Sequence, residues 1–300
     1  MIMECKIHGI EHSYFEIKRL ISNLASKYPF ISVNNIGKSV AGRDIPVLSL
    51  GAAGDFTLFV TGDDPACRIT TLMLLSFIAE LSEKILAGKQ MCGINIRKAM
   101  FGRGIAILPL ANPDGFEIAT RGASGCGAMA PKISRICAGD FSKWRANLRG
   151  VELSRNFFPG FEERRQNERE EHISGPRFEG FSGYRPESEP ETAAIADFCR
   201  NKNVRQLIHL SAFGQTVMYS GLSVVPPRSA KMAEVMAAVT SFTVTPPISK
   251  CEFNLCDWFT YELLKPAITV KIGAGSVPPV EELTYWYART RELLTLSCLF

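Results

Sequence analysis

The chain has 300 residues, of which 46% are hydrophobic and 21% are charged, and this composition excludes a disordered or fibrous protein. The formal net charge of +4 comes from dispersed basic residues, which does not indicate nucleic-acid binding but leaves room for an acidic or carboxylate-bearing ligand. The length suits one large domain with a buried core.

The lack of a secretory signal and the scattered cysteines both lead us to expect a reducing compartment. The residues from Met1 to His8 lack the basic and apolar regions of a secretory signal, and no apolar run is long enough to span a membrane. The nine cysteines are scattered, which fits reduced core thiols better than a disulfide framework. We therefore expect a cytoplasmic protein without membrane contact, with one domain over 1–300 that includes an amino-terminal extension over 1–12.

The first half of the chain predicts three strands and two helices. A capping box of Ser13 and Glu16 begins a helix that ends near Pro29. Apolar residues at helical spacing predict a core helix from Ile69 to Ile85, ended by Gly88. Short β-rich runs predict successive strands of one sheet at 30–36, 45–50 and 56–61.

The remaining elements alternate between strands and helices. A further strand is expected over 104–110, and surface loops are expected over 122–139 and 162–171, where the sequence has no apolar period. Ser188, with Glu191 as its capping-box partner, predicts a helix to about 201. Strands are then expected at 205–211 and 267–272, and helices at 227–242 and 280–298. This order predicts an α/β protein with three α/β/α layers and a doubly wound, mainly parallel, mixed sheet.

The strand ends predict where a ligand would bind. In a doubly wound sheet the site lies at the carboxyl ends of the central strands. The segments 61–67, 211–215 and 271–275 each follow a predicted central strand. We expect these three segments to converge on one crevice.

Five short motifs carry a resemblance to a known family. They are Asn112-Pro113-Asp114-Gly115, Trp144-Arg145-Ala146-Asn147, the segment 150–157, the segment 188–192 and Asp257-Trp258. In this order they resemble the signatures of the zinc carboxypeptidases, over about residues 14–294. The segments at Trp144 and Gly150 are most similar to the bacterial peptidases that cut γ-D-glutamyl-diamino acid bonds in cell-wall peptides. The resemblance implies a zinc-carboxypeptidase-like fold, a catalytic zinc ion and a peptide substrate.

The chain departs from the family at the positions that carry its chemistry. The resemblance puts Asp64, Cys67 and Ser211 at the zinc-ligand positions and Lys271 at the position of the catalytic glutamate. Aspartate and cysteine can bind zinc, but a neutral serine hydroxyl is a poor ligand. A lysine ammonium cannot act as the general base, and its charge opposes a nearby metal ion. We therefore predict no bound metal and no catalytic residue.

Two hypotheses describe the crevice without metal. In the first, Lys271 neutralises Asp64 or Asp63, since a buried carboxylate needs a partner. In the second, these side chains are simply solvated. His209 lies on the strand face of Ser211 but roughly 6 to 7 Å away along the strand, so it does not simply replace the missing imidazole.

Other reactive side chains carry weaker hypotheses. A metal site of Asp64, Cys67 and His209 stays as an alternative. Cys67 lacks an obvious neighbouring base for nucleophilic catalysis. The other cysteines are expected in the core, and the remaining histidines are expected in solvent, namely His8, His12 and His172.

The resemblance also implies substrate-binding residues. Arg155 and Arg145 match basic positions of the family, where a guanidinium can hold a substrate carboxylate. Ser154 replaces the asparagine that usually precedes the first of these arginines. The alternative role for Arg155 is an ion pair within the framework.

These observations favour a pseudoenzyme. We expect a metal-free, zinc-carboxypeptidase-like protein without catalysis that binds carboxylate-bearing peptides of the cell-wall type. The first alternative is a residual metallo-carboxypeptidase or γ-D-glutamyl-diamino acid peptidase, with zinc at a non-standard site. The second is a structural or regulatory partner of an active paralogue.

Overall fold

The computed structural model describes residues 13–52, 54–221, 225–247 and 254–300. The extension predicted over 1–12, with His8 and His12, lies outside the described residues. The described chain forms an eight-stranded mixed sheet in the order β1-β2-β4-β3-β5-β8-β6-β7. The strands are β1 (Ser32–Lys38), β2 (Asp44–Gly51), β3 (Phe56–Val60), β4 (Gly104–Leu108), β5 (Val204–Ala212), β6 (Thr216–Tyr219), β7 (Thr243–Thr245) and β8 (Ala267–Ile272).

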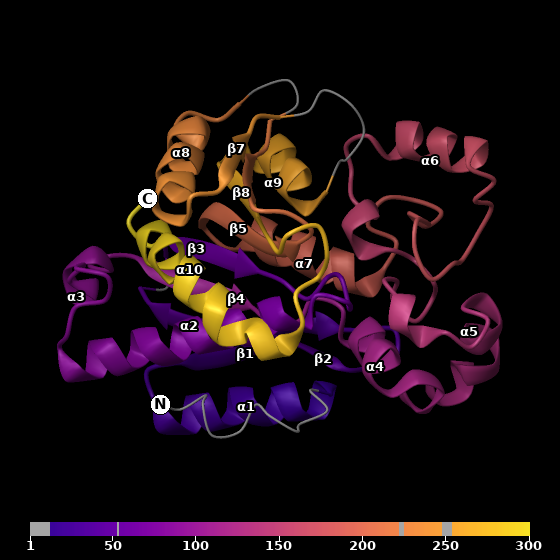
Figure 1. The fold of residues 1–300 in the computed structure, drawn as a ribbon, viewed down its shortest axis with the longest axis horizontal. Helices are drawn as coiled ribbons and strands as arrows, with labels where there is room; N and C mark the ends of the chain where they lie inside the picture. The colour runs from indigo at the N-terminus through magenta and orange to yellow at the C-terminus, as the bar shows by residue number, and fades with distance from the viewer. Residues whose placement is uncertain (1–12, 53, 222–224, 248–253) are drawn as a thin grey trace.

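Helices cover both faces of this sheet (Figure 1). One face packs against α1 (Tyr14–Lys27), α2 (Arg68–Ala87), α8 (Ser229–Thr240) and α10 (Leu283–Ser297). The other face packs against α7 (Pro190–Asn201) and α9 (Leu255–Leu263). The central strands alternate between the two cores: Phe59 of β3 enters the first, while Leu58 and Val60 enter the second. The predicted three-layer α/β/α fold is therefore confirmed.

A third group of elements extends beyond the sheet edge, at the right of Figure 1. It contains α4 (Pro113–Arg121), α5 (Ala130–Ile136) and α6 (Phe161–Glu170). The short helix α3 (Ile96–Ala99), which follows α2, is not part of this group. A small core joins α4 and α5, because Ile118 and Ile133 belong to one buried cluster with Trp144. None of the described helices combines the length and apolar character that a bilayer crossing needs.

The strand register brings the predicted crevice segments together. β3 and β5 are parallel neighbours, with Val60 opposite His209. β5 and β8 are also parallel neighbours, with Ser211 opposite Lys271. The segments that follow these three strands therefore lie at one edge of the sheet, as the sequence predicts.

Several local predictions were wrong. The segments 122–139 and 162–171 are not irregular loops, since they contain α5 and α6. β1 and β2 pair with each other, but β4 lies between β2 and β3, so the third predicted strand is not next to the second in the sheet. The helix after Ser188 begins with Glu189 as its N-cap, and the Ser188 hydroxyl donates to the Glu189 carboxylate.

Candidate functional site

The loop after β3 carries two adjacent carboxylates, Asp63 and Asp64, at the sheet edge where the three predicted segments meet. Gly62 begins this loop at φ +73°, and a Cβ atom there would lie 2.9 Å from the Pro109 carbonyl oxygen. The Asn112 backbone N–H donates to the Gly62 carbonyl at 2.8 Å, and Asn112 Nδ2 donates to the Asp63 carbonyl at 3.2 Å. Only glycine fits this close approach without strain, so Gly62 determines the path of the backbone that leads into Asp63 and Asp64.

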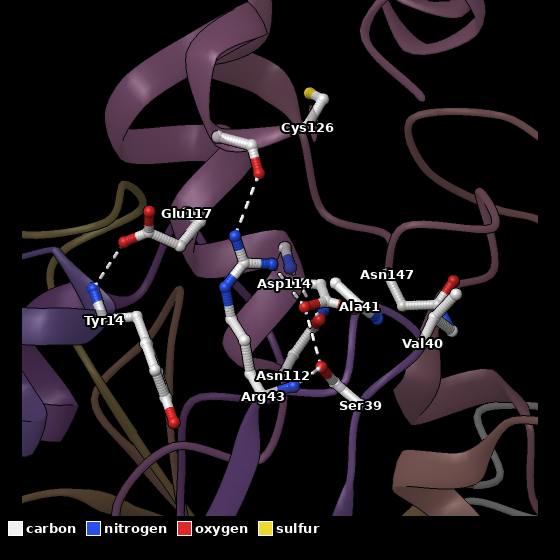
Figure 2. Close-up of polar contacts among 12 residues, drawn as sticks. Tyr14, Ser39, Val40, Ala41, Arg43, Asn112, Asp114, Glu117, Cys126 and Asn147 are labelled. Carbon is white, nitrogen blue, oxygen red and sulfur yellow. Dashed lines mark hydrogen bonds and ion pairs between the residues drawn. The ribbon is translucent and has the colours of Figure 1, made fainter. Parts of the chain in front are cut away.

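The predicted turn motif at Asn112 is held by a buried ion pair (Figure 2). The fully buried Asp114 carboxylate accepts hydrogen bonds from Arg43 Nη1 at 2.6 Å and from Ser39 Oγ at 2.7 Å. Arg43 Nη2 also donates to the Gly125 carbonyl at 3.1 Å. A buried charge with this many partners is a scaffold for the crevice loop, and it does not face the crevice as a reactive group.

Asp63 pairs with a histidine from the neighbouring strand. His209 Nε2 lies 2.8 Å from Asp63 Oδ1, and both side chains are largely buried. Burial lowers the pKa of His209, but the Asp63 carboxylate outweighs burial and raises that pKa to about 10. Burial raises the pKa of Asp63, yet the His209 charge and backbone N–H groups leave it below its ordinary value. The pair is therefore an imidazolium and a carboxylate at neutral pH.

Asp64 pairs with an arginine from the Trp144 motif. Arg145 Nη2 contacts Asp64 Oδ2, and only 12% of the Asp64 side chain is exposed. The Cys67 thiol donates to the same oxygen at 3.5 Å. Burial raises the pKa of Asp64, and the Arg145 guanidinium offsets only part of that shift. Burial and the neighbouring carboxylates also raise the pKa of Cys67 well above its ordinary value, so Cys67 is a neutral thiol.

Lys271 does not neutralise either carboxylate, so the first crevice hypothesis was wrong. Lys271 lies opposite Ser211 in the sheet, but it forms no ion pair with Asp63 or Asp64. Those two carboxylates are taken by His209 and Arg145. His209 is on β5, the strand next to β3, whereas Lys271 is on β8, one strand further away. Arg145 reaches Asp64 from the Trp144 motif.

The other predicted substrate-binding residues converge on one carboxylate. Arg155 Nε lies 3.2 Å from Glu152 Oε2, and Ser154 Oγ donates to Glu152 Oε1 at 3.0 Å. Burial lowers the pKa of the Arg145 guanidinium, but the Asp64 charge and then the Glu152 charge raise it above its ordinary value. Arg155 therefore has the framework ion pair that the sequence leaves as an alternative, and Arg145 is paired with Asp64 instead.

The residues predicted at the ligand positions do not fit a zinc ion. A zinc site needs at least three imidazole, thiolate or carboxylate donors. Asp64 is engaged by Arg145, and Ser211 offers a neutral hydroxyl, which leaves Cys67 as the one strong donor of the three. His209 faces Asp63. Within the described ranges, no three histidine, cysteine, aspartate or glutamate side chains come together in a group that could hold a metal.

A cavity of about 480 Å³ opens beside Arg145. Arg68 and Lys143 share its lining with Arg145, together with Glu179 and the exposed ring of Phe213. The ring centroid of Phe213 lies 5.4 Å from the Arg145 guanidinium carbon. Of the predicted substrate-binding residues, only Arg145 lines this cavity.

Sequence reasoning missed both ion pairs. The Asp63–His209 pair could be predicted from the pairing of two parallel strands. Residue 60 lies opposite residue 209, so the loop that follows β3 comes close to the histidine. The Asp64–Arg145 pair has no such signal, because the arginine comes from a loop 81 residues later.

Comparisons with known proteins agree with this fold. The chain is 25% identical over 281 residues to "Gamma-D-glutamyl-L-diamino acid endopeptidase 1" of Lysinibacillus sphaericus, covering 92% of this chain and 69% of that protein. It is 26% identical over 294 residues to the uncharacterized protein YqgT of Bacillus subtilis (strain 168), covering 95% and 76%. The structure is similar to thrombin activatable fibrinolysis inhibitor, with a TM-score of 0.74 and 18% identity over 96% of this chain and 73% of that one.

The family model described as zinc carboxypeptidase matches residues 17–241. This range includes β1 to β6, the two carboxylates after β3 and the Trp144 motif. The chain belongs to the zinc carboxypeptidase family.

Proposed function

We propose that this chain is a metal-free, non-hydrolytic member of the zinc carboxypeptidase family that binds carboxylate-bearing peptides. The observation that carries the proposal is the ion pair between Asp64 and Arg145. A carboxylate that already has a guanidinium partner does not need a metal ion to balance its charge.

The charges around the crevice oppose a bound zinc ion. A zinc ion at Asp64 would have to displace Arg145 and would then lie near two cations, the displaced guanidinium and the protonated His209. Unit charges of like sign at about 4 Å repel by about 4 kcal/mol at the effective dielectric of a protein surface. Two good donors, Asp64 and Cys67, do not offset such a cost.

The same charges oppose peptide hydrolysis. Hydrolysis of this kind needs a group that takes a proton from water and gives it to the leaving amine. Asp63 and Asp64 are held in ion pairs, and Lys271 is a cation. The arrangement supports binding of a peptide without a general base to cleave it.

Two observations support carboxylate-bearing peptides as the ligand class: the name of a similar protein and the positive charge of the cavity. The similar protein of Lysinibacillus sphaericus is described as an endopeptidase for γ-D-glutamyl-L-diamino acids. Peptides with this bond carry several free carboxylates, and three cationic side chains line the cavity beside Arg145. Charge complementarity therefore favours such peptides over neutral ones.

Two assays with a γ-D-glutamyl-diaminopimelate peptide test the proposal. The peptide is incubated with the purified chain, with and without added zinc, and cleavage is followed by mass spectrometry. Isothermal titration calorimetry measures binding. The Lysinibacillus endopeptidase serves as the positive control for cleavage. We expect binding without cleavage in both arms.

The other outcomes contradict the proposal in different ways. Cleavage that depends on zinc would establish the residual metallopeptidase. Absence of both binding and cleavage would favour a structural or regulatory partner of an active paralogue. Cleavage that survives chelation would show that the chain has a hydrolytic group that works without metal, which contradicts the proposed lack of a general base.

A further inference from the structure

The cavity beside Arg145 has an excess of positive charge. Three of its side chains are cationic, namely Arg68, Lys143 and Arg145, and one is acidic, namely Glu179. Arg145 is committed to Asp64, so its charge is largely balanced. The excess therefore resides on Arg68 and Lys143.

Among the cations of this cavity, Arg68 is the one without a partner among the residues that the structure describes. It is the first residue of α2 and is half-buried. Within the part of the chain that the structure describes, its guanidinium has no hydrogen bond or ion pair. Lys143 is 73% exposed and has only a distant contact with Asp140, at 4.0 Å. A half-buried guanidinium without a partner is suited to a planar carboxylate, which it can hold by two parallel hydrogen bonds.

Part of the cavity lining is apolar. It includes Val277, Pro278 and the ring of Phe213, which is 47% exposed. Phe213 has φ +70°, a conformation that costs a non-glycine residue free energy. The exposed Phe213 ring lines the cavity, where it can pack on the aliphatic part of a ligand.

We propose that Arg68, assisted by Lys143, binds a carboxylate of the peptide ligand and determines its specificity, while Phe213 contacts the adjacent aliphatic segment. This inference rests on the proposed function, since it names the residues that hold the same ligand. It differs from the sequence expectation, in which Arg155 grips the carboxylate. Arg155 is bound to Glu152 and does not line the cavity.

The test is calorimetric titration of the full chain with the γ-D-glutamyl-diaminopimelate peptide and with its amidated analogue. The variants are Arg68→Met, which removes the charge but keeps the length, and Arg68→Lys, which keeps the charge. Arg155→Ala tests the rival residue. Arg19→Met is the matched control, because Arg19 is 65% exposed on α1 and lies outside the cavity.

We expect Arg68→Met to weaken binding of the carboxylate peptide by about tenfold, the usual effect of losing a charged hydrogen bond. The variant should no longer distinguish the peptide from its amide. Arg68→Lys should retain most of the affinity, and Arg155→Ala and Arg19→Met should bind like the wild type. Binding by the wild type should weaken between about 0.1 M and about 1 M salt.

Equal affinities of Arg68→Met and the wild type would overturn the inference while leaving the proposed function intact. A loss confined to Arg155→Ala would do the same and would restore the sequence expectation. No binding by the wild type would overturn both. Unfolding temperatures of the variants equal to that of the wild type show that a loss of binding is not a loss of fold.

Discussion

Arg145 and Asp64 form an ion pair that joins two segments 81 residues apart in the chain. One partner lies on the loop after β3, and the other follows the fully buried Trp144. The pair balances a carboxylate at the point where the family resemblance implies a zinc ligand. Each side chain thus balances the charge of the other, and removing either should lower the free energy of unfolding because a partly buried charge is left without its partner.

Arg145→Met should lower the free energy of unfolding by about 2 kcal/mol at neutral pH, because it leaves Asp64 buried without its cation. The double variant Arg145→Met with Asp64→Asn should recover much of this loss, since no charge remains uncompensated. Urea unfolding of the four proteins in the cycle measures the coupling. Additive effects of the two substitutions would contradict the pairing.

The Asp63–His209 pair predicts a loss of stability in alkali. The pKa of His209 is about 10 in the folded protein and about 6.5 as the ordinary value. Since the folded state holds this proton more tightly, the stabilisation is complete below pH 6.5 and is lost as the pH rises through 10. The free energy of unfolding should fall by a few kcal/mol across this window. His209→Gln, which keeps a hydrogen-bond donor without titrating, should remove this part of the fall; an unchanged pH profile would contradict the prediction.

Glu191 predicts a second pH dependence at lower pH. It is fully buried and accepts hydrogen bonds from Asn147 Nδ2 at 3.2 Å and from the Val40 backbone N–H at 3.1 Å. Burial raises the pKa of Glu191 from 4.5 to about 7 despite these donors. Its contribution to stability is therefore present below pH 4.5 and is lost as the pH rises through 7.

Chemical unfolding at several pH values checks the role of Glu191. Glu191→Gln should flatten the stability profile between pH 4.5 and 7, whatever its effect on absolute stability. The exposed Glu171→Gln is the control and should leave the profile unchanged. Parallel profiles for wild type and Glu191→Gln would show that this carboxylate does not titrate in the window.

Restoring the residues of the family should restore a metal site. The quadruple variant Asp64→His, Cys67→Glu, Ser211→His and Lys271→Glu supplies three donors and removes one cation. It should bind about one zinc ion per chain, and Arg145 is then free of its carboxylate partner. Elemental analysis after dialysis measures the metal. A folded quadruple variant without zinc would show that the scaffold no longer supports the site.

The sequence predicts the central architecture because periodicity and strand ends are local signals. The apolar run at 56–60 and the helical spacing after Ile69 identify β3 and α2 without tertiary information. The convergence of the strand ends then follows from the topology of a doubly wound sheet. The Gly62 turn and the Asn112 motif also mark the crevice in the sequence.

Elements stabilised by tertiary contacts were not predictable in this way. The segment of α6 is dense in charge and reads as a surface loop, yet Arg164 and Glu168 are buried in the structure. Glu168 accepts a hydrogen bond from the Ser182 backbone N–H at 2.8 Å, a partner that no local pattern reveals. The short strands β6 and β7 likewise depend on pairing with β8 and with each other.

In the site, too, some features could be predicted from the sequence and others depend on tertiary contacts. The resemblance places residues other than the family's usual ones at 64, 67, 211 and 271, but it does not identify the cations that pair with the two carboxylates. Lys271 was the obvious cation, because it ends a strand of the same crevice; the structure gives the carboxylates to Arg145 and His209. For Asp64 the outcome depends on an arginine from a segment 81 residues away, which sequence spacing does not reveal, whereas His209 is on the strand next to β3.

The zinc content of the wild-type chain, purified without chelator and measured by mass spectrometry of the elements, tests the central claim most directly. The Asp64–Arg145 ion pair predicts far less than one zinc ion per chain, before and after zinc is offered and the excess is dialysed away. About one zinc ion per chain, retained through mild chelation, would contradict the account.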